Sequence, residues 1–187
     1  ITALPIIETL AGDISAYIPT NVISITDGQI FLESELFFSG QRPAVNIGLS
    51  VSRVGGAAQT KAMKKAVGSL KIDLAQFREM EAFTQFSSDL DAATKEQLEH
   101  GKRLLEMLKQ ALSSPLQLWE QVVTLYVATN KLMLDVPLNE IKKFQKEMLE
   151  FFQKEHGEIV TEITEKKVLS DELKEAILNA AKEFKSR

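Results

Sequence analysis

The chain has 187 residues, of which 44% are hydrophobic and 26% are charged, and its formal net charge is −4. These values are typical of an ordinary soluble globular protein, long enough for one good core or two modest ones.

The absence of cysteine excludes disulfides and thiolate metal sites, and no apolar run approaches the roughly 18 to 20 residues of a membrane span. Basic residues alternate with acidic ones, which argues against nucleic-acid binding. His100 and His156 lack ligand-like spacing, so no metal site is predicted.

Charge is distributed unevenly along the chain. The first 56 residues hold only two basic residues, Arg42 and Arg53, and five acidic ones, whereas the remainder holds 20 basic and 21 acidic residues. A charge-poor segment suits burial in a sheet or between subunits. The sequence begins at Ile1, without an initiator methionine and directly in a strand-like run, and we therefore expect a segment of a longer chain.

The charge-poor part shows strand and turn patterns. Residues 14–26 are ambiguous, because Pro19 and the β-branched residues after it suit either a strand or a single helical turn entered through proline. Four other short elements are expected before residue 42. They are a buried strand at 4–7, a turn at 27–28, a strand at 29–33, and one turn of helix at 35–38 closed by Gly40.

Residues 42–56 form the most informative stretch, an alternating pattern that predicts a strand. One face would carry Ile47, Leu49 and Val51, and the other would carry glycine and serine, small enough for another surface to approach closely. The strand ends in Arg53, which is followed by a glycine pair at 55–56.

Arg53 allows two interpretations from spacing alone. Ligands bind at the carboxyl ends of strands in open α/β sheets, and arginine is charged at any ordinary pH. The alternative is a structural arginine paired with a carboxylate of its own chain, such as Asp27 or Glu33.

From residue 57 onward the apolar periodicity is helical. Gly68 predicts a kink or break, residues 87–91 interrupt the pattern, and Ser114, Pro137 and Ser170 mark helix starts. The predicted inward faces are Met63, Val67, Leu70, Leu74 and Phe77; Leu98, Leu105, Leu108 and Leu112; Trp119, Val122, Val123 and Tyr126; Ile141, Phe144, Met148 and Phe152; and Leu173, Ile177 and Phe184.

Long contiguous runs resemble a known family. They are residues 3–9, 17–33, 42–56, 57–59 and 86–91. These runs are similar to the alpha-subunit family of the F-type ATP synthases. The resemblance implies an α/β remnant of a P-loop NTPase (RecA-like) nucleotide-binding domain at residues 1–59. An all-α helical bundle domain would follow at residues 60–187, so that the chain is mostly helical.

The resemblance also implies site residues. Arg53 would be a catalytic arginine finger that reaches in trans into the site of a neighbouring beta subunit, with Ser50 beside it. Ser24 and Val51 would line the same interface, although ordinary strand packing is the alternative for these small residues.

Three further residues match positions near a nucleotide that the alpha subunit binds without turning it over: Arg42, Pro43 and Gln110. Where the family often has a second glutamine, this chain has Leu112. The phosphate-binding Gly-x-x-x-x-Gly-Lys-Ser/Thr motif does not occur here, since the pair at 101–102 falls in a helical pattern. The nucleotide would be ATP or ADP with Mg²⁺, whose phosphate and metal ligands lie outside this chain.

The implied partners are the ATP synthase beta subunit in an alternating hexamer, the central-stalk gamma subunit and the peripheral-stalk or delta subunit. Residues 86–91 would face the central stalk, or form only a solvated helix cap. The complex would be peripheral, on the cytoplasmic (or matrix or stromal) face of an energy-coupling membrane, and would couple proton transport to ATP synthesis. Alternatives are a non-catalytic subunit of a related rotary ATPase and a helical interaction module without nucleotide chemistry.

Overall fold

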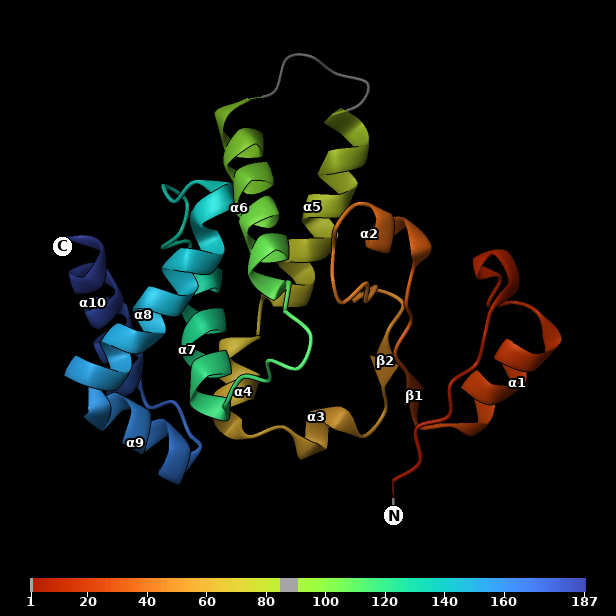
Figure 1. Cartoon of the computed structure of the whole chain (residues 1–187), viewed down its shortest axis with the longest axis horizontal. Coiled ribbons are helices and arrows are strands. Elements are labelled where there is room, and N and C mark those ends of the chain that lie inside the picture. Colours follow the sequence, from red (N-terminus) through yellow and green to blue (C-terminus); the bar gives the residue numbers. More distant parts are fainter. Residues whose placement is uncertain (1, 85–90) are drawn as a thin grey trace. The chain divides into compact units, whose positions relative to one another are not determined.

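A computed structural model describes residues 2–84 and 91–187 (Figure 1). The chain separates into two compact units, Ile1–Ala58 and Gln59–Arg187. The first mixes short helices with a small sheet, and all regular elements in the described part of the second are helices. The expected fold class, an α/β remnant followed by a helical bundle, is confirmed.

The first unit is built around a two-stranded antiparallel sheet. Gly28 lies opposite Ser52, and Gln29 lies opposite Val51. Gly28 has φ +152°, and a Cβ atom there would lie 2.2 Å from the Val51 carbonyl oxygen, so the close approach of the strands requires glycine. The elements are η1 (Leu10–Gly12), α1 (Tyr17–Ile25), β1 (Gly28–Gln29), α2 (Ser34–Phe38), β2 (Val51–Ser52) and α3 (Gly55–Ala58).

The strand predicted at residues 4–7 is wrong. This segment has no regular secondary structure, and Leu4 and Ile6 are 82% and 97% exposed. A buried strand needs neighbouring strands to satisfy its backbone hydrogen bonds, and no strand among the described residues pairs with it. The apolar pattern of residues 4–7 therefore does not correspond to a strand in the described structure.

The ambiguous segment 14–26 contains the helix α1, which is longer than the single helical turn considered. Pro19 lies in the first turn of α1, where its missing N–H costs no intrahelical hydrogen bond. The predicted turn of helix closed by Gly40 is confirmed as α2, and Gly40 takes φ +88°. The strand expected at 29–33 is reduced to β1 and an isolated bridge between Leu32 and Val45.

The long alternating strand predicted at residues 42–56 is also wrong. Asn46 folds the chain into a turn: its side-chain oxygen accepts from the Leu49 N–H at 3.0 Å, and its carbonyl accepts from the Ser50 N–H at 3.0 Å. The turn at 47–49 breaks the alternation, and only β2 remains as strand. An asparagine that bonds the backbone locally competes with strand pairing, which alternation alone does not reveal.

The second unit is a bundle of helices in which α5 packs against α6, α4 against α7, and α8 against both α6 and α9 (Figure 1). No helix in the described ranges is long and apolar enough to cross a bilayer. The elements are α4 (Lys61–Ala66), α5 (Leu70–Thr84), α6 (Ala92–Leu108), α7 (Leu118–Thr129), η2 (Leu138–Glu140), α8 (Ile141–Glu155), α9 (Gly157–Lys166) and α10 (Asp171–Lys185).

Most predicted core positions of the bundle are confirmed. The chain breaks between α4 and α5 around Gly68, as expected. Ser170 caps α10 by accepting from the Leu173 N–H at 3.1 Å. Each fully buried large side chain contributes about 1.5 to 3 kcal/mol to folding. Buried residues from the predicted faces are Leu70, Leu74, Phe77, Leu98, Trp119, Val122, Val123, Ile141, Met148, Phe152, Leu173 and Ile177.

Two predictions in the bundle are wrong, and one helix was missed. Leu112 is 97% exposed because α6 ends at Leu108. Ser114 does not cap the next helix, because α7 begins at Leu118 with Gln117 and Glu120 forming a reciprocal capping box. The helix α9 was not predicted as a separate element.

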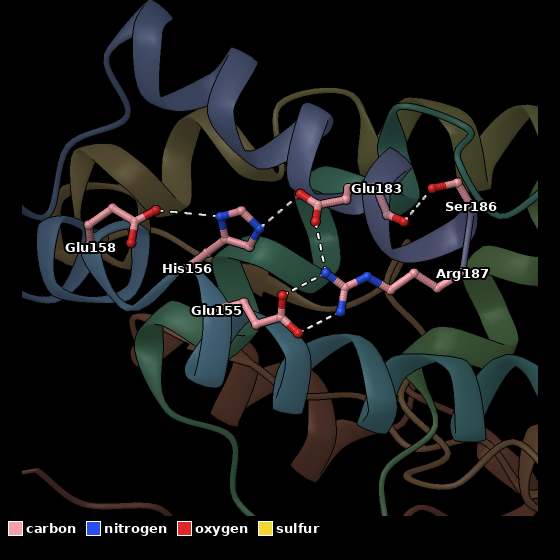
Figure 2. A network of polar contacts seen from close by, with 6 residues as sticks. All are labelled: Glu155, His156, Glu158, Glu183, Ser186 and Arg187. Carbon is pink, nitrogen blue, oxygen red and sulfur yellow. Dashed lines mark hydrogen bonds and ion pairs between the residues drawn. The ribbon is translucent and has the colours of Figure 1, made fainter.

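A polar network joins the ends of α8, α9 and α10 (Figure 2). The Arg187 guanidinium donates to both carboxylate oxygens of Glu155, at 2.5 and 2.6 Å, and to Glu183 at 2.9 Å. The imidazole of His156 lies between Glu158 and Glu183, with each ring nitrogen 3.4 Å from a carboxylate oxygen. The network therefore ties the end of α10 to the preceding helices.

Candidate functional site

Arg53 follows β2 directly, and hydrogen bonds fix the backbone on both sides of it. Its N–H donates to the Asp27 carbonyl at 2.8 Å, which continues the pairing of β1 with β2. On the other side, the Gly55 N–H donates to the Ser52 hydroxyl at 2.8 Å. The position of the Arg53 main chain is therefore set by the sheet and by the turn into α3.

The Arg53 side chain is exposed, and it makes no ion pair or hydrogen bond within residues 2–84 and 91–187. The internal pair with Asp27 or Glu33 is not formed. Asp27 contacts Arg53 through its backbone carbonyl, and Glu33 accepts from the Asn46 side-chain amide at 2.8 Å. A permanent positive charge is thus available to a group outside this unit.

Ser50 is half-buried and its hydroxyl holds the turn before β2. The hydroxyl donates to the Asn46 carbonyl at 2.6 Å and accepts from the Phe31 N–H at 3.0 Å. Val51, in β2, is 48% exposed. Ser24 is exposed on α1, where its hydroxyl donates to the Asn21 carbonyl at 2.7 Å. Both serine hydroxyls are engaged with the backbone of their own chain.

The Arg42 side chain lies over the aromatic ring of Phe37. Its guanidinium carbon is 4.4 Å from the centroid of the Phe37 ring, within the range of a cation–π contact. Pro43 follows through a cis peptide bond, and both residues are exposed. Sequence reasoning missed Phe37, because an aromatic residue five positions before an arginine is not a recognisable pattern.

Gln110 belongs to the second unit and lies just beyond the end of α6. Its side-chain Nε2 donates to the Ser114 carbonyl at 2.6 Å and closes the connector at residues 109–117. Gln110 is exposed, as is Leu112 two positions later. The Gln110 Oε1 atom and its second N–H have no partner among the described residues.

Residues 86–91, expected to face a central stalk, lie outside the described residues apart from Asp91. Asp91 caps α6 by accepting from the Thr94 N–H at 2.6 Å. In the ranges that are described, no three histidine or carboxylate side chains gather in a way that could hold a metal ion.

Two family models match the chain. The ATP synthase alpha/beta chain, C terminal domain, matches residues 59–184. The ATP synthase alpha/beta family, nucleotide-binding domain, matches residues 1–52. The chain belongs to the ATP synthase alpha/beta family. Arg53 lies between the two matched ranges, at the point where the nucleotide-binding match of this family ends.

Curated proteins similar to this chain are named ATP synthase subunit alpha. The chain is 59% identical over 185 residues to the ATP synthase subunit alpha of Clostridium kluyveri, and the match covers 99% of this chain and 37% of the relative. It is 58% identical to those of Thermobifida fusca and Acetivibrio thermocellus, covering 99% and 100% of this chain. The chain spans 34% and 37% of the length of these two relatives.

Proposed function

We propose that this chain is a carboxyl-terminal portion of an ATP synthase alpha subunit, the regulatory subunit of a proton-transporting ATPase. Two family models and relatives named subunit alpha, 58% to 60% identical, support the assignment. The sequence contains no phosphate-binding loop motif. On this proposal the chain is not active alone and contributes to chemistry on a nucleotide held elsewhere.

The guanidinium of Arg53, which is exposed and has no partner among the residues that the structure describes, carries the proposal. Phosphoryl transfer spreads negative charge over the oxygens of the moving group, and a planar guanidinium can donate to two of those oxygens together. Arginine fingers in other NTPases raise turnover by about 10³ to 10⁵. The bonds that fix the backbone at Arg53 support this role, because a finger must be held in place before the substrate arrives.

Ser50, Val51 and Ser24 are proposed to line the same interface with the beta subunit. Ser50 holds the turn that precedes β2, so its contribution would come through the position of Arg53. The exposed Val51 and Ser24 leave room for a facing subunit. None of these three residues brings a charge that would oppose an incoming phosphate.

Arg42, Pro43 and Gln110 are proposed to contact a second, non-catalytic ATP or ADP. Arg42 offers an exposed guanidinium stacked on Phe37, which suits a phosphate. Gln110 keeps an amide oxygen and one N–H for the edge of a base. The phosphate and Mg²⁺ ligands of this nucleotide are proposed to lie outside this chain.

The partners proposed are an alternating beta subunit, the gamma subunit of the central stalk and the delta subunit or peripheral stalk. The complex would lie on the cytoplasmic, matrix or stromal face of an energy-coupling membrane. Native mass spectrometry of the purified complex tests the assignment. We expect this subunit together with an equal number of copies of a partner that contains a phosphate-binding loop. A complex without such a partner would overturn the proposal.

A further inference from the structure

Lys142, in the first turn of α8, has an unusual environment for a lysine. It is half-buried, and its Nζ donates to the Met107 carbonyl at 2.7 Å and to Gln145 Oε1 at 3.0 Å. Met107 lies in the last turn of α6, where carbonyls have no partner within the helix. Gln145 is itself buried and donates to the Thr124 hydroxyl at 3.4 Å. Two uncharged acceptors therefore hold the nitrogen between α6 and α8.

No carboxylate of the described residues forms an ion pair with Lys142. Glu106 pairs instead with Lys109 at 2.5 Å. Burial lowers the pKa of Lys142 to about 8, the Glu106 carboxylate opposes this effect, and the Lys109 ammonium adds to it. At pH 7.5 roughly a quarter of the Lys142 side chains would be free amine, against about a thousandth for an ordinary lysine.

We propose that Lys142 is an acyl-accepting modification site for small activated acyl donors such as acyl phosphates. The free amine nitrogen attacks the acyl carbonyl carbon and forms a C–N bond. The C–O bond to phosphate breaks, phosphate leaves with the electron pair, and the proton lost from nitrogen goes to solvent. A neutral, desolvated lysine is the nucleophile that this step needs. The donor must be small because the residue is half-buried.

Acylation changes how α6 and α8 are joined. The ammonium has three N–H donors, whereas the amide that replaces it has one and carries no charge. Either the Met107 carbonyl or Gln145 Oε1 then loses its donor, although both are satisfied in the unmodified chain. The modification is therefore expected to loosen the end of α6. This inference does not depend on the proposed function.

Three lysines of α8 allow an internal comparison. Lys142, Lys143 and Lys146 lie between Glu140 and Glu147, so cleavage after glutamate yields them on one peptide. Lys143 and Lys146 are exposed. The chain is treated with limiting acetyl phosphate at pH 7.5, and fragment mass spectrometry measures acetylation at each lysine. We expect Lys142 to react about tenfold faster than Lys143 in the folded chain, and at an equal rate in urea.

The pH profile and one variant complete the test. The acetylation rate of Lys142 should level off above about pH 8, whereas that of Lys143 should still rise at pH 9. Glu106→Gln removes the carboxylate that favours the ammonium, and should increase the preference for Lys142. Acetylation of Lys142 no faster than that of Lys143 in the folded chain, or a preference that persists in urea, would overturn the proposal.

Discussion

Gly101 on α6 lies directly against the ring of Phe77 on α5. A Cβ atom at position 101 would lie 2.2 Å from Phe77 Cδ2, far inside van der Waals contact. Phe77 is 1% exposed and belongs to the core of the bundle, so its ring has little room to move. The close approach of these two helices therefore requires glycine, although glycine lowers helix propensity.

Gly101→Ala should destabilise the second unit. Overpacking costs about 1 to 3 kcal/mol, and alanine regains roughly 1 kcal/mol through its higher helix propensity. Because the contact with Phe77 is far too short, we expect a cost near the upper end and a net loss of up to about 2 kcal/mol in the free energy of unfolding. Urea titration can follow this loss through the fluorescence of Trp119, the chain's one tryptophan, which is buried.

Gly157→Ala is the matched control, since a Cβ atom there would meet nothing within 4 Å. Because Gly157 is the first residue of α9, its replacement by alanine should leave the stability unchanged or raise it by up to about 1 kcal/mol. Equal stabilities of the two alanine variants would contradict the packing described for Gly101.

Stability should fall on acidification because of His100. Burial lowers the pKa of this histidine on α6, the Asp73 and Glu96 carboxylates oppose the shift, and Lys131 and Arg103 add to it. The unfolded chain therefore binds a proton more readily than the folded chain. The contribution of neutral His100 to the free energy of unfolding therefore decreases as the pH falls below about 6.5, the ordinary pKa of histidine.

The His100→Gln variant tests this pH dependence. Chemical denaturation of both chains at pH 7.5 and pH 5.5 gives the loss of stability between the two values. We expect a smaller loss in the variant, because glutamine does not titrate. The same loss in both chains would show that His100 makes no contribution.

The network in Figure 2 should hold the end of α10 in place. Arg187 bonds to Glu155 and Glu183, and its guanidinium carbon lies 4.6 Å from the centroid of the Phe151 ring. Arg187→Ala removes all of these contacts. We expect faster hydrogen exchange of the amides in the last turn of α10, measured by mass spectrometry, and little change in global stability because the pairs are exposed.

Lys182→Ala serves as the control for Arg187, because Lys182 is exposed on the same helix and outside the network. High salt should reduce the difference between Arg187→Ala and the parent chain, since it screens the ion pairs. Exchange in the last turn that is unchanged in Arg187→Ala would count against the network as an anchor.

The sequence predicted the bundle better than the sheet. Apolar residues at helical spacing, as in α8 with Ile141 and Met148, mark a face that packs wherever the helix lies. A strand is stable only with a partner, and residues 4–7 have none in the described part of the chain. The end of α6 at Leu108 was missed because Leu112 continued the apolar spacing of that helix.

For the candidate site, the sequence identified charges but not their surroundings. The isolation of Arg53 in a charge-poor segment pointed to a special role, yet the Asn46 turn that replaces the predicted strand left no signal in the alternation. The contact of Arg42 with Phe37 and the burial of Lys142 depend on tertiary packing. These features could not be inferred from spacing along the chain.

Steady-state ATP hydrolysis by the assembled complex carrying Arg53→Lys tests the central proposal most directly. Lysine keeps the positive charge but lacks the planar, two-pronged arrangement of N–H donors with which a guanidinium binds two phosphoryl oxygens. We therefore expect turnover to fall by about 10³ while nucleotide still binds. Arg42→Lys, at a site proposed to be non-catalytic, should keep most of the activity. Hydrolysis by Arg53→Lys at a rate close to that of the unmodified complex would contradict the proposal that Arg53 acts in trans.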